Sequence, residues 1–141
     1  MKKFVPGELV RAEEINANFS ELYTEQTVTL PVFDGAWRHD PGGGVARTVN
    51  GTTHLSISLV RTGSSFHMGP GGIIDVMRVN NLVRVPSTRE WVICGTLFGP
   101  GIWPMPIFLD KGLVRVLCYG DVDIQNNGAY RGYATWTVGQ Q

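Results

Sequence analysis

The sequence predicts a mostly β protein, in which a short N-terminal amphipathic helix precedes an antiparallel, jelly-roll-like β-sandwich. Apolar residues recur with helical spacing only near the N-terminus, and from Thr27 onward they follow a period of two. Short strand-like segments then alternate with turns, which the 18 Gly and 8 Pro supply, and no second helical segment follows. We therefore divide the chain into an attachment or trimerisation segment, residues 1–26, and a β-sandwich head domain, residues 27–141.

The charge balance bears on the class of partner. Lys and Arg number 12 and Asp and Glu number 12, so the formal net charge of the 141-residue chain is zero. A protein that tracks phosphates needs a basic face, so this balance argues against nucleic-acid binding. Charged residues make up only 17% of the chain, and a near-neutral, lightly charged surface favours association with other proteins.

The predicted helix carries one apolar seam with spacings of three, four and three residues, formed by Ala12, Ile15, Phe19 and Leu22. Pro6-Gly7 marks its start and the β-branched run Thr27–Thr29 its end. A helix of this length is marginal alone in water, so the seam needs a partner. Either it folds back on the β domain, or copies of it associate about an axis or dock on a larger body.

The clearest strand is Thr52–Val60. In it Leu55, Ile57 and Leu59 share one face, while His54, Ser56 and Ser58 share the other. The run 90–98 is the most apolar and is predicted to be central, and Asp110-Lys111-Gly112 is predicted to turn a hairpin. Strands are predicted at 27–33, 36–38, 52–60, 73–79, 82–85, 90–98, 107–109, 113–119, 121–124 and 132–138.

The two cysteines are predicted to be free, buried thiols. We expect Cys94 on the same face as Val92 and Phe98, and Cys118 on the same face as Val114 and Val116. Unpaired thiols are typical of a chain that folds in a reducing cytoplasm.

The N-terminus does not have the pattern of a signal peptide. Met1-Lys2-Lys3 is basic, but Pro6-Gly7 interrupts the apolar residues that follow it. No apolar run approaches the length of a membrane span, so no membrane partner is predicted.

No catalytic, metal or cofactor site is predicted. His39, His54 and His67 are widely separated and share no metal-ligand spacing with a cysteine or carboxylate. Asp121 and Asp123 lie two apart on one strand face, which is more typical of a solvated surface than of a calcium site or glycosidase. The glycine-rich loops lack the Lys-Ser/Thr of a phosphate loop. An enzyme is therefore not expected.

Aromatic residues near turns are the candidate contact residues: Trp103 in a Pro- and Gly-rich loop, and Tyr130 and Tyr133 on either side of Gly132. A ring held on a loop above a rigid β scaffold suits stacking on a sugar or contact with a protein. Alternatively, Trp103 closes the end of the sandwich or packs on a neighbouring subunit.

The N-terminal segment resembles that of small bacteriophage tail-fibre and virion-appendage proteins. The resemblance covers about 20 residues: Phe4–Gly7, Leu9 and the run Ala12–Phe19, which contains Ile15-Asn16 and Phe19. The chain departs from the pattern at Arg11, where such segments often have a Ser or Thr that can cap the helix.

The remainder is similar to the C-terminal β domains of minor tail proteins of siphophages. The residues that carry this likeness are Gly35, Trp37, Arg38, Gly112, Val114, Arg115, Val116, Tyr133 and Trp136. The resemblance implies a homotrimeric virion protein whose helix attaches it to other virion proteins and whose head binds a host-surface glycan or protein. The alternative is a capsid decoration or head-fibre protein, and a depolymerase comes third. The resemblance supplies no catalytic residues.

Overall fold

A computed structural model of the chain describes residues 25–86 and 92–138, and within them the protein is all-β and antiparallel. The predicted helical seam, Ala12, Ile15, Phe19 and Leu22, lies outside the described residues. The strands are β1 (Glu25–Thr29), β2 (Trp37–His39), β3 (Val45–Val49), β4 (Thr52–Arg61), β5 (Phe66–Met68), β6 (Ile73–Arg78), β7 (Val92–Phe98), β8 (Met105–Asp110), β9 (Leu113–Leu117), β10 (Val122–Ile124) and β11 (Ala129–Thr137).

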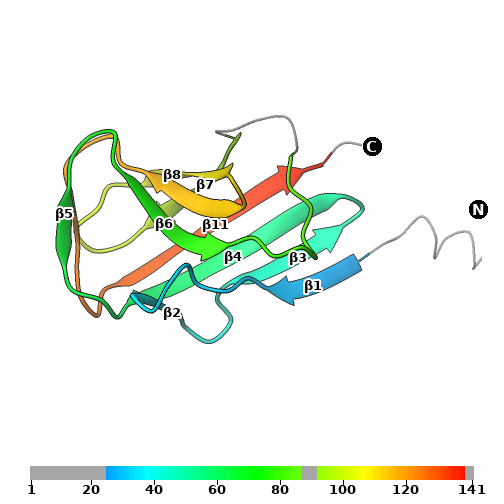
Figure 1. Cartoon of the computed structure of the whole chain (residues 1–141), viewed down its shortest axis with the longest axis horizontal. Coiled ribbons are helices and arrows are strands. Elements are labelled where there is room, and N and C mark those ends of the chain that lie inside the picture. The colour runs from blue at the N-terminus through cyan, green and yellow to red at the C-terminus, as the bar shows by residue number, and fades with distance from the viewer. Residues whose placement is uncertain (1–24, 87–91, 139–141) are drawn as a thin grey trace, which may run out of the picture.

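Nine of these strands form one curled sheet, in the order β1-β3-β4-β11-β7-β8-β9-β6, with β2 also paired to β4 (Figure 1). The two edges of the sheet meet just after β1, where Val32 forms an isolated bridge with Met77 of β6. Phe33 N donates to Val76 O (3.0 Å) and Arg78 N donates to Pro31 O (2.9 Å) at the same place. The remaining strands, β5 and β10, form a small two-stranded sheet at one end.

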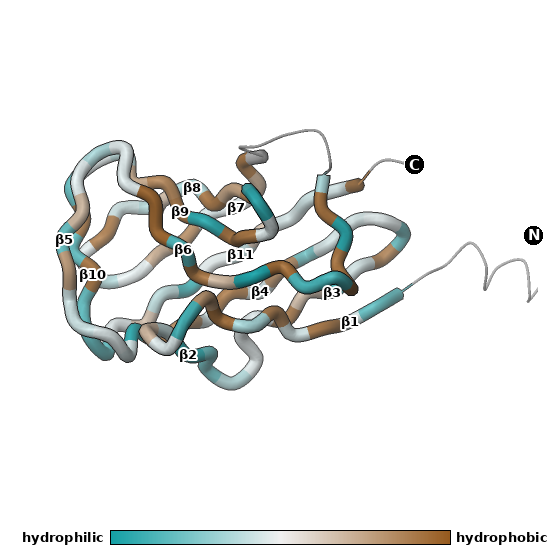
Figure 2. The backbone as a smooth tube through the Cα atoms, in the orientation of Figure 1, coloured by the Kyte–Doolittle hydropathy of each residue, from teal (hydrophilic) through white to brown (hydrophobic). Residues whose placement is uncertain are grey.

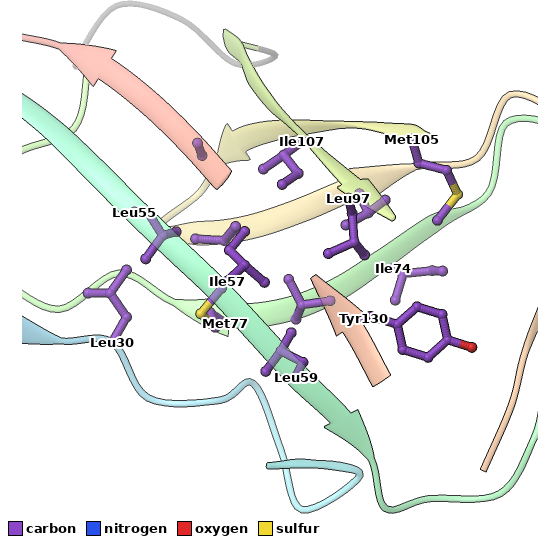
Figure 3. Close-up of a cluster of buried hydrophobic side chains, with 14 of the residues drawn as sticks. Leu30, Leu55, Ile57, Leu59, Ile74, Met77, Leu97, Met105, Ile107 and Tyr130 are labelled. Carbon is purple, nitrogen blue, oxygen red and sulfur yellow. The ribbon is translucent and has the colours of Figure 1, made fainter. Parts of the chain in front are cut away.

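The hydrophobic core lies inside the curl. Leu55, Ile57 and Leu59 of β4 are buried, as their alternation predicts, and they share one cluster with Met77 of β6 and Ile107 of β8 (Figure 3). Hydrophobic and hydrophilic residues alternate along β4 from His54 to Leu59 (Figure 2). A nonpolar inner face and a polar outer face are what an antiparallel sheet covered on one side requires.

The prediction of an antiparallel β head is confirmed, but its strands form one curled sheet with a small second one. A bulge in β7, between Ile93 and Gly95, and another in β6, between Asp75 and Met77, interrupt the register. Bulges bend a strand and increase its twist. β7 lies in the middle of the strand order, between β11 and β8, and residues of β4 and β6, on either side of it, share one core inside the curl.

The hairpins show which turns the sequence signalled. The predicted turn at Asp110-Lys111-Gly112 joins β8 to β9, and both central residues have positive φ, 53° at Lys111 and 74° at Gly112. A second hairpin joins β3 to β4 through Asn50-Gly51, with φ of 49° and 84°. The strands β3 and β5 were not among the predicted strands, although Asn-Gly is a strong hairpin signal.

The predicted strand at 82–85 is wrong, because this segment forms turns and irregular backbone. Asn80 causes the bend: its side-chain Oδ1 accepts a hydrogen bond from Leu82 N (2.9 Å), and its backbone O accepts one from Val83 N (3.3 Å). An asparagine that bonds its own backbone two residues on favours a turn over a strand.

Both cysteines are free, as predicted, but their surroundings differ. Cys118 is buried with Val114 and Val116. Cys94 is only half-buried, and Phe98, which was expected to share its buried face, is 44% exposed. The bulge at Cys94 changes which face of β7 points inward, so Leu97 takes the buried position instead of Phe98.

Burial raises the pKa of the Cys94 thiol to about 11, and burial also raises that of Cys118. A raised thiol pKa leaves little thiolate at neutral pH, and thiolate is the reactive form. We therefore expect both thiols to react slowly with a thiol reagent at pH 7 until denaturant is added. Mass spectrometry over time measures this, and rapid labelling of both native thiols would contradict it.

Candidate ligand-binding surface

The small sheet of β5 and β10 has one apolar and one polar face. Phe66, Met68, Val122 and Ile124 contribute to the hydrophobic core. His67 lies between Phe66 and Met68, and Asp123 lies between Val122 and Ile124, so both are on the opposite, polar face. Asp121, just before β10, is on that face as well. This sheet lies at the opposite end of the molecule from Glu25, where β1 begins (Figures 1 and 2).

His67 lies between the two aspartates. Its Nδ1 is 2.7 Å from Asp123 Oδ1, and its Nε2 is 3.3 Å from Asp121 Oδ1. The hydrogen bond to Asp123 raises the pKa of His67, as do the charge of Asp123 and the interactions with Asp121, while desolvation opposes them. All three side chains are more than half exposed, so this arrangement is a surface feature open to a ligand.

The arrangement does not form a metal centre. The two nitrogens of an imidazole ring point in different directions, and here each one faces a different carboxylate. Their donors therefore do not converge on one point. Within residues 25–86 and 92–138, no group of three or more His, Cys, Asp or Glu side chains is placed to hold a metal ion. His39 and His54 lie elsewhere, beside Leu30 and Thr135 respectively.

The loop that contains Trp103 lies next to this cluster. Gly101 O accepts a hydrogen bond from Asp123 N (2.9 Å), and Pro104 O accepts one from Tyr119 Oη (2.5 Å). Residues 101–104 thus lie alongside residues 119–123 in antiparallel sense, which places Trp103 opposite the stretch that contains Asp121. Trp103 is 67% exposed and Tyr119 is 55% exposed. We call Trp103, Tyr119, Asp121, Asp123 and His67 the distal cluster.

Tyr130, a predicted contact residue, is fully buried in the core. Its ring packs edge-on against Trp37, with centroids 5.9 Å apart. Its hydroxyl accepts a hydrogen bond from Gln125 N (2.8 Å) and donates one to Pro100 O (3.0 Å). The structure therefore corrects its assignment: Tyr130 supports the loop that leads to Trp103 and is not itself available to a partner.

Tyr133 is 60% exposed, but it lies on the outer face of the main sheet instead of on a loop. Its cross-strand neighbours are Ser56 of β4 and Thr96 of β7. Phe98, also exposed, lies on the same face one pair further along. Tyr133 thus belongs to a largely polar sheet face and not to the distal cluster.

A cavity of about 370 Å³ lies at the other end of the molecule, beside β1. The described residues that line it are Glu25, Gln26, Thr48, Gly51, Leu82 and Arg84. It lies beside Glu25, where β1 begins, and therefore at the end of the molecule opposite the small sheet.

The sequence indicated part of the distal cluster. The exposed Trp103 was predicted from its Pro- and Gly-rich loop, and the shared face of Asp121 and Asp123 from their spacing. His67 and Tyr119 were missed as site residues. Tyr119 follows β9 immediately before Gly120, which is a weak loop signal, whereas His67 meets Asp123 only through a pairing of strands 56 residues apart in sequence.

No helix in the described part of the chain has the length and apolar character that crossing a membrane requires. Comparison of the chain with protein-family models, with curated proteins and with solved structures finds no match.

Proposed function

We propose that the protein is a structural bacteriophage virion protein of the small tail-fibre or receptor-binding type. Residues 1–24 attach the head to the particle, and the curled sheet, with its core inside the curl, acts as a sandwich-like head toward the host surface. The observation that carries the proposal is the position of the distal cluster, with exposed Trp103 and Tyr119, at the end opposite Glu25. A binding surface placed far from the attachment point is free to reach a cell.

The distal cluster has the side chains that recognise a host-surface glycan. An indole ring offers a flat apolar face to a sugar, and carboxylates accept hydrogen bonds from its hydroxyl groups. Pro104 and Pro106 follow Trp103 and restrict the backbone, which lowers the entropy cost of holding the ring in place.

Attachment and assembly are assigned to the N-terminal segment. Its seam of Ala12, Ile15, Phe19 and Leu22 forms a homotrimer in this proposal, or docks on another virion protein. Three heads on one axis would present three distal clusters, and linked sites raise the effective concentration of one another. A weak single site is then enough for adsorption.

Replacing Trp103 with alanine tests the proposal. We expect adsorption to host envelope fragments to fall about tenfold or more, because one stacked aromatic ring contributes about 1 kcal/mol per site and linked sites multiply the loss. The melting temperature should stay nearly unchanged, since the Trp103 side chain is 67% exposed. A pull-down on envelope fragments together with a thermal melt measures both quantities.

The matched control is Tyr133→Ala, which removes a ring of similar exposure (60% against 67% for Trp103) from the outer sheet face. If this variant loses adsorption while Trp103→Ala keeps it, the binding surface is the sheet face. If the wild-type protein shows no affinity for host envelope, the receptor-binding function is refuted and the capsid decoration protein takes its place. Cryo-electron microscopy of the particle would then locate the protein on the head.

A further inference from the structure

The segments that form the distal end of the molecule contain two carboxylates and no Lys or Arg. They are residues 62–72, 99–106 and 118–128, which backbone and side-chain hydrogen bonds hold together. Their two carboxylates are Asp121 and Asp123. Arg61, at the end of β4, brings one cation to this end: its guanidinium lies over the ring of Phe66, on the inward side of the small sheet, and its Nε donates to Ser64 O (3.2 Å). The outward face of the small sheet, where Asp121 and Asp123 lie, therefore attracts cations when His67 is neutral.

The two carboxylates already pair with an internal cation in one protonation state. When His67 is protonated, its two ring nitrogens donate to Asp121 Oδ1 and Asp123 Oδ1. The second oxygen of each carboxylate makes no hydrogen bond within the described residues. The two carboxylates can therefore accept hydrogen bonds from N–H donors or face a positive charge, and each has one oxygen left to accept a hydrogen bond from a ligand.

Trp103 adds the second element of a cation site. Its loop runs alongside residues 119–123, so the backbone of Trp103 lies opposite the stretch that contains Asp121, and its side chain is exposed. An ammonium group gains most from the face of a Trp ring among the aromatic side chains, and nearby carboxylates strengthen that attraction. We propose that the distal cluster binds an ammonium group, quaternary or protonated, carried by a host-surface polymer. This inference rests on the proposed function and specifies its ligand.

The geometry also makes His67 a competitor for the same carboxylates. Below the pKa of His67, which its pairing with the aspartates raises, the imidazolium neutralises part of their charge. Above that pKa the ring is neutral, and the whole charge of both carboxylates acts on the ligand. The groups that face His67 are Asp123 and Asp121, and the adjoining loop 99–106 has no titratable side chain. Affinity for a permanently charged ammonium should therefore rise with pH.

The experiment is a titration of the full chain with choline and, separately, with its uncharged isostere 3,3-dimethyl-1-butanol. Binding is measured from the nuclear magnetic resonance signal of the Trp103 indole N–H. We expect choline to bind with a dissociation constant on the order of millimolar, because a small ligand at an exposed site gains few contacts. The isostere should bind at least fivefold more weakly. Between about pH 5.5 and pH 9, which spans a raised histidine pKa, choline affinity should increase about two- to fivefold.

Three variants sharpen the result. Asp121→Asn combined with Asp123→Asn should abolish the preference for choline over the isostere, whereas Asp34→Asn, an exposed carboxylate that caps its own turn at Ala36, should not change it. His67→Gln should keep choline binding and remove its pH dependence. Equal binding of choline and the isostere, or a preference that survives in the double variant, overturns the inference. If the inference fails in this way but adsorption to the host still depends on Trp103, the proposed function stands. If the protein binds choline as expected but does not adsorb to host envelope, the proposed function is refuted and the ammonium site stands.

Discussion

Replacing Tyr130 with alanine is expected to lower the free energy of unfolding by about 4 kcal/mol, the cost of removing a large aromatic side chain from a core. Tyr130 is fully buried, packs edge-on against Trp37 and bonds two backbone groups through its hydroxyl. Alanine leaves a cavity and also leaves Gln125 N without its partner. Urea denaturation followed by tryptophan fluorescence measures the change.

The control is Tyr130→Phe, which keeps the ring and removes only the hydroxyl. It should cost about 1–2 kcal/mol, because two hydrogen bonds in a half-buried setting are lost. Pro100 is one of the hydroxyl's partners, so this variant should also weaken ligand binding at Trp103 more than its stability loss explains. An alanine variant within about 1 kcal/mol of wild type would contradict the buried position of Tyr130.

Gly132→Ala is expected to destabilise the protein by about 3 kcal/mol or more, at the upper end of overpacking effects. A Cβ atom at Gly132 would overlap the backbone oxygen of Thr96 on β7, and one at Gly95 would overlap that of Tyr133 on β11. Backbone atoms in a paired sheet cannot rotate away as a flexible side chain does. The close approach of β7 and β11 therefore depends on these two glycines.

Gly120→Ala is the matched control, because a Cβ atom there meets no atom within 4 Å and its φ is not positive. Its stability should stay within about 0.5 kcal/mol of wild type. The midpoints of urea denaturation of the two variants give the comparison. If Gly132→Ala is as stable as Gly120→Ala, β7 and β11 lie further apart than the structure places them.

Local patterns in the sequence predicted the parts of the fold that depend on neighbouring residues. The alternation of Leu55, Ile57 and Leu59 set the inward face of β4, and Lys111-Gly112 set a hairpin. The alternation in β11 held a further signal: Arg131 and Thr135 share a face with Tyr133, so Tyr130 belongs to the opposite, buried face. Reading the polar residues together with the aromatic ones would have separated the two tyrosines.

Features that depend on distant pairing could not be predicted in this way. The pairing of β5 with β10 brings His67 to Asp123, and no local pattern indicates which strands pair. The bulge at Cys94 reverses the inward face of β7 within one strand, so that Leu97 is buried where Phe98 was expected. The single curled sheet also follows from bulges, which have no clear signature in one sequence.

The link between the two edges of the main sheet has a mechanical consequence. In the proposed arrangement, a head bound to a cell at the distal cluster and held to the particle before Glu25 is under tension along its long axis. β1 runs roughly along that axis (Figure 1), so the pull shears its pairing with β3 and loads the hydrogen bonds together instead of one at a time. Just beyond β1, Leu30 forms a backbone hydrogen bond with Gly44, and Pro31 and Phe33 form backbone hydrogen bonds with β6 on the opposite edge. The force therefore passes from one strand into both halves of the sheet.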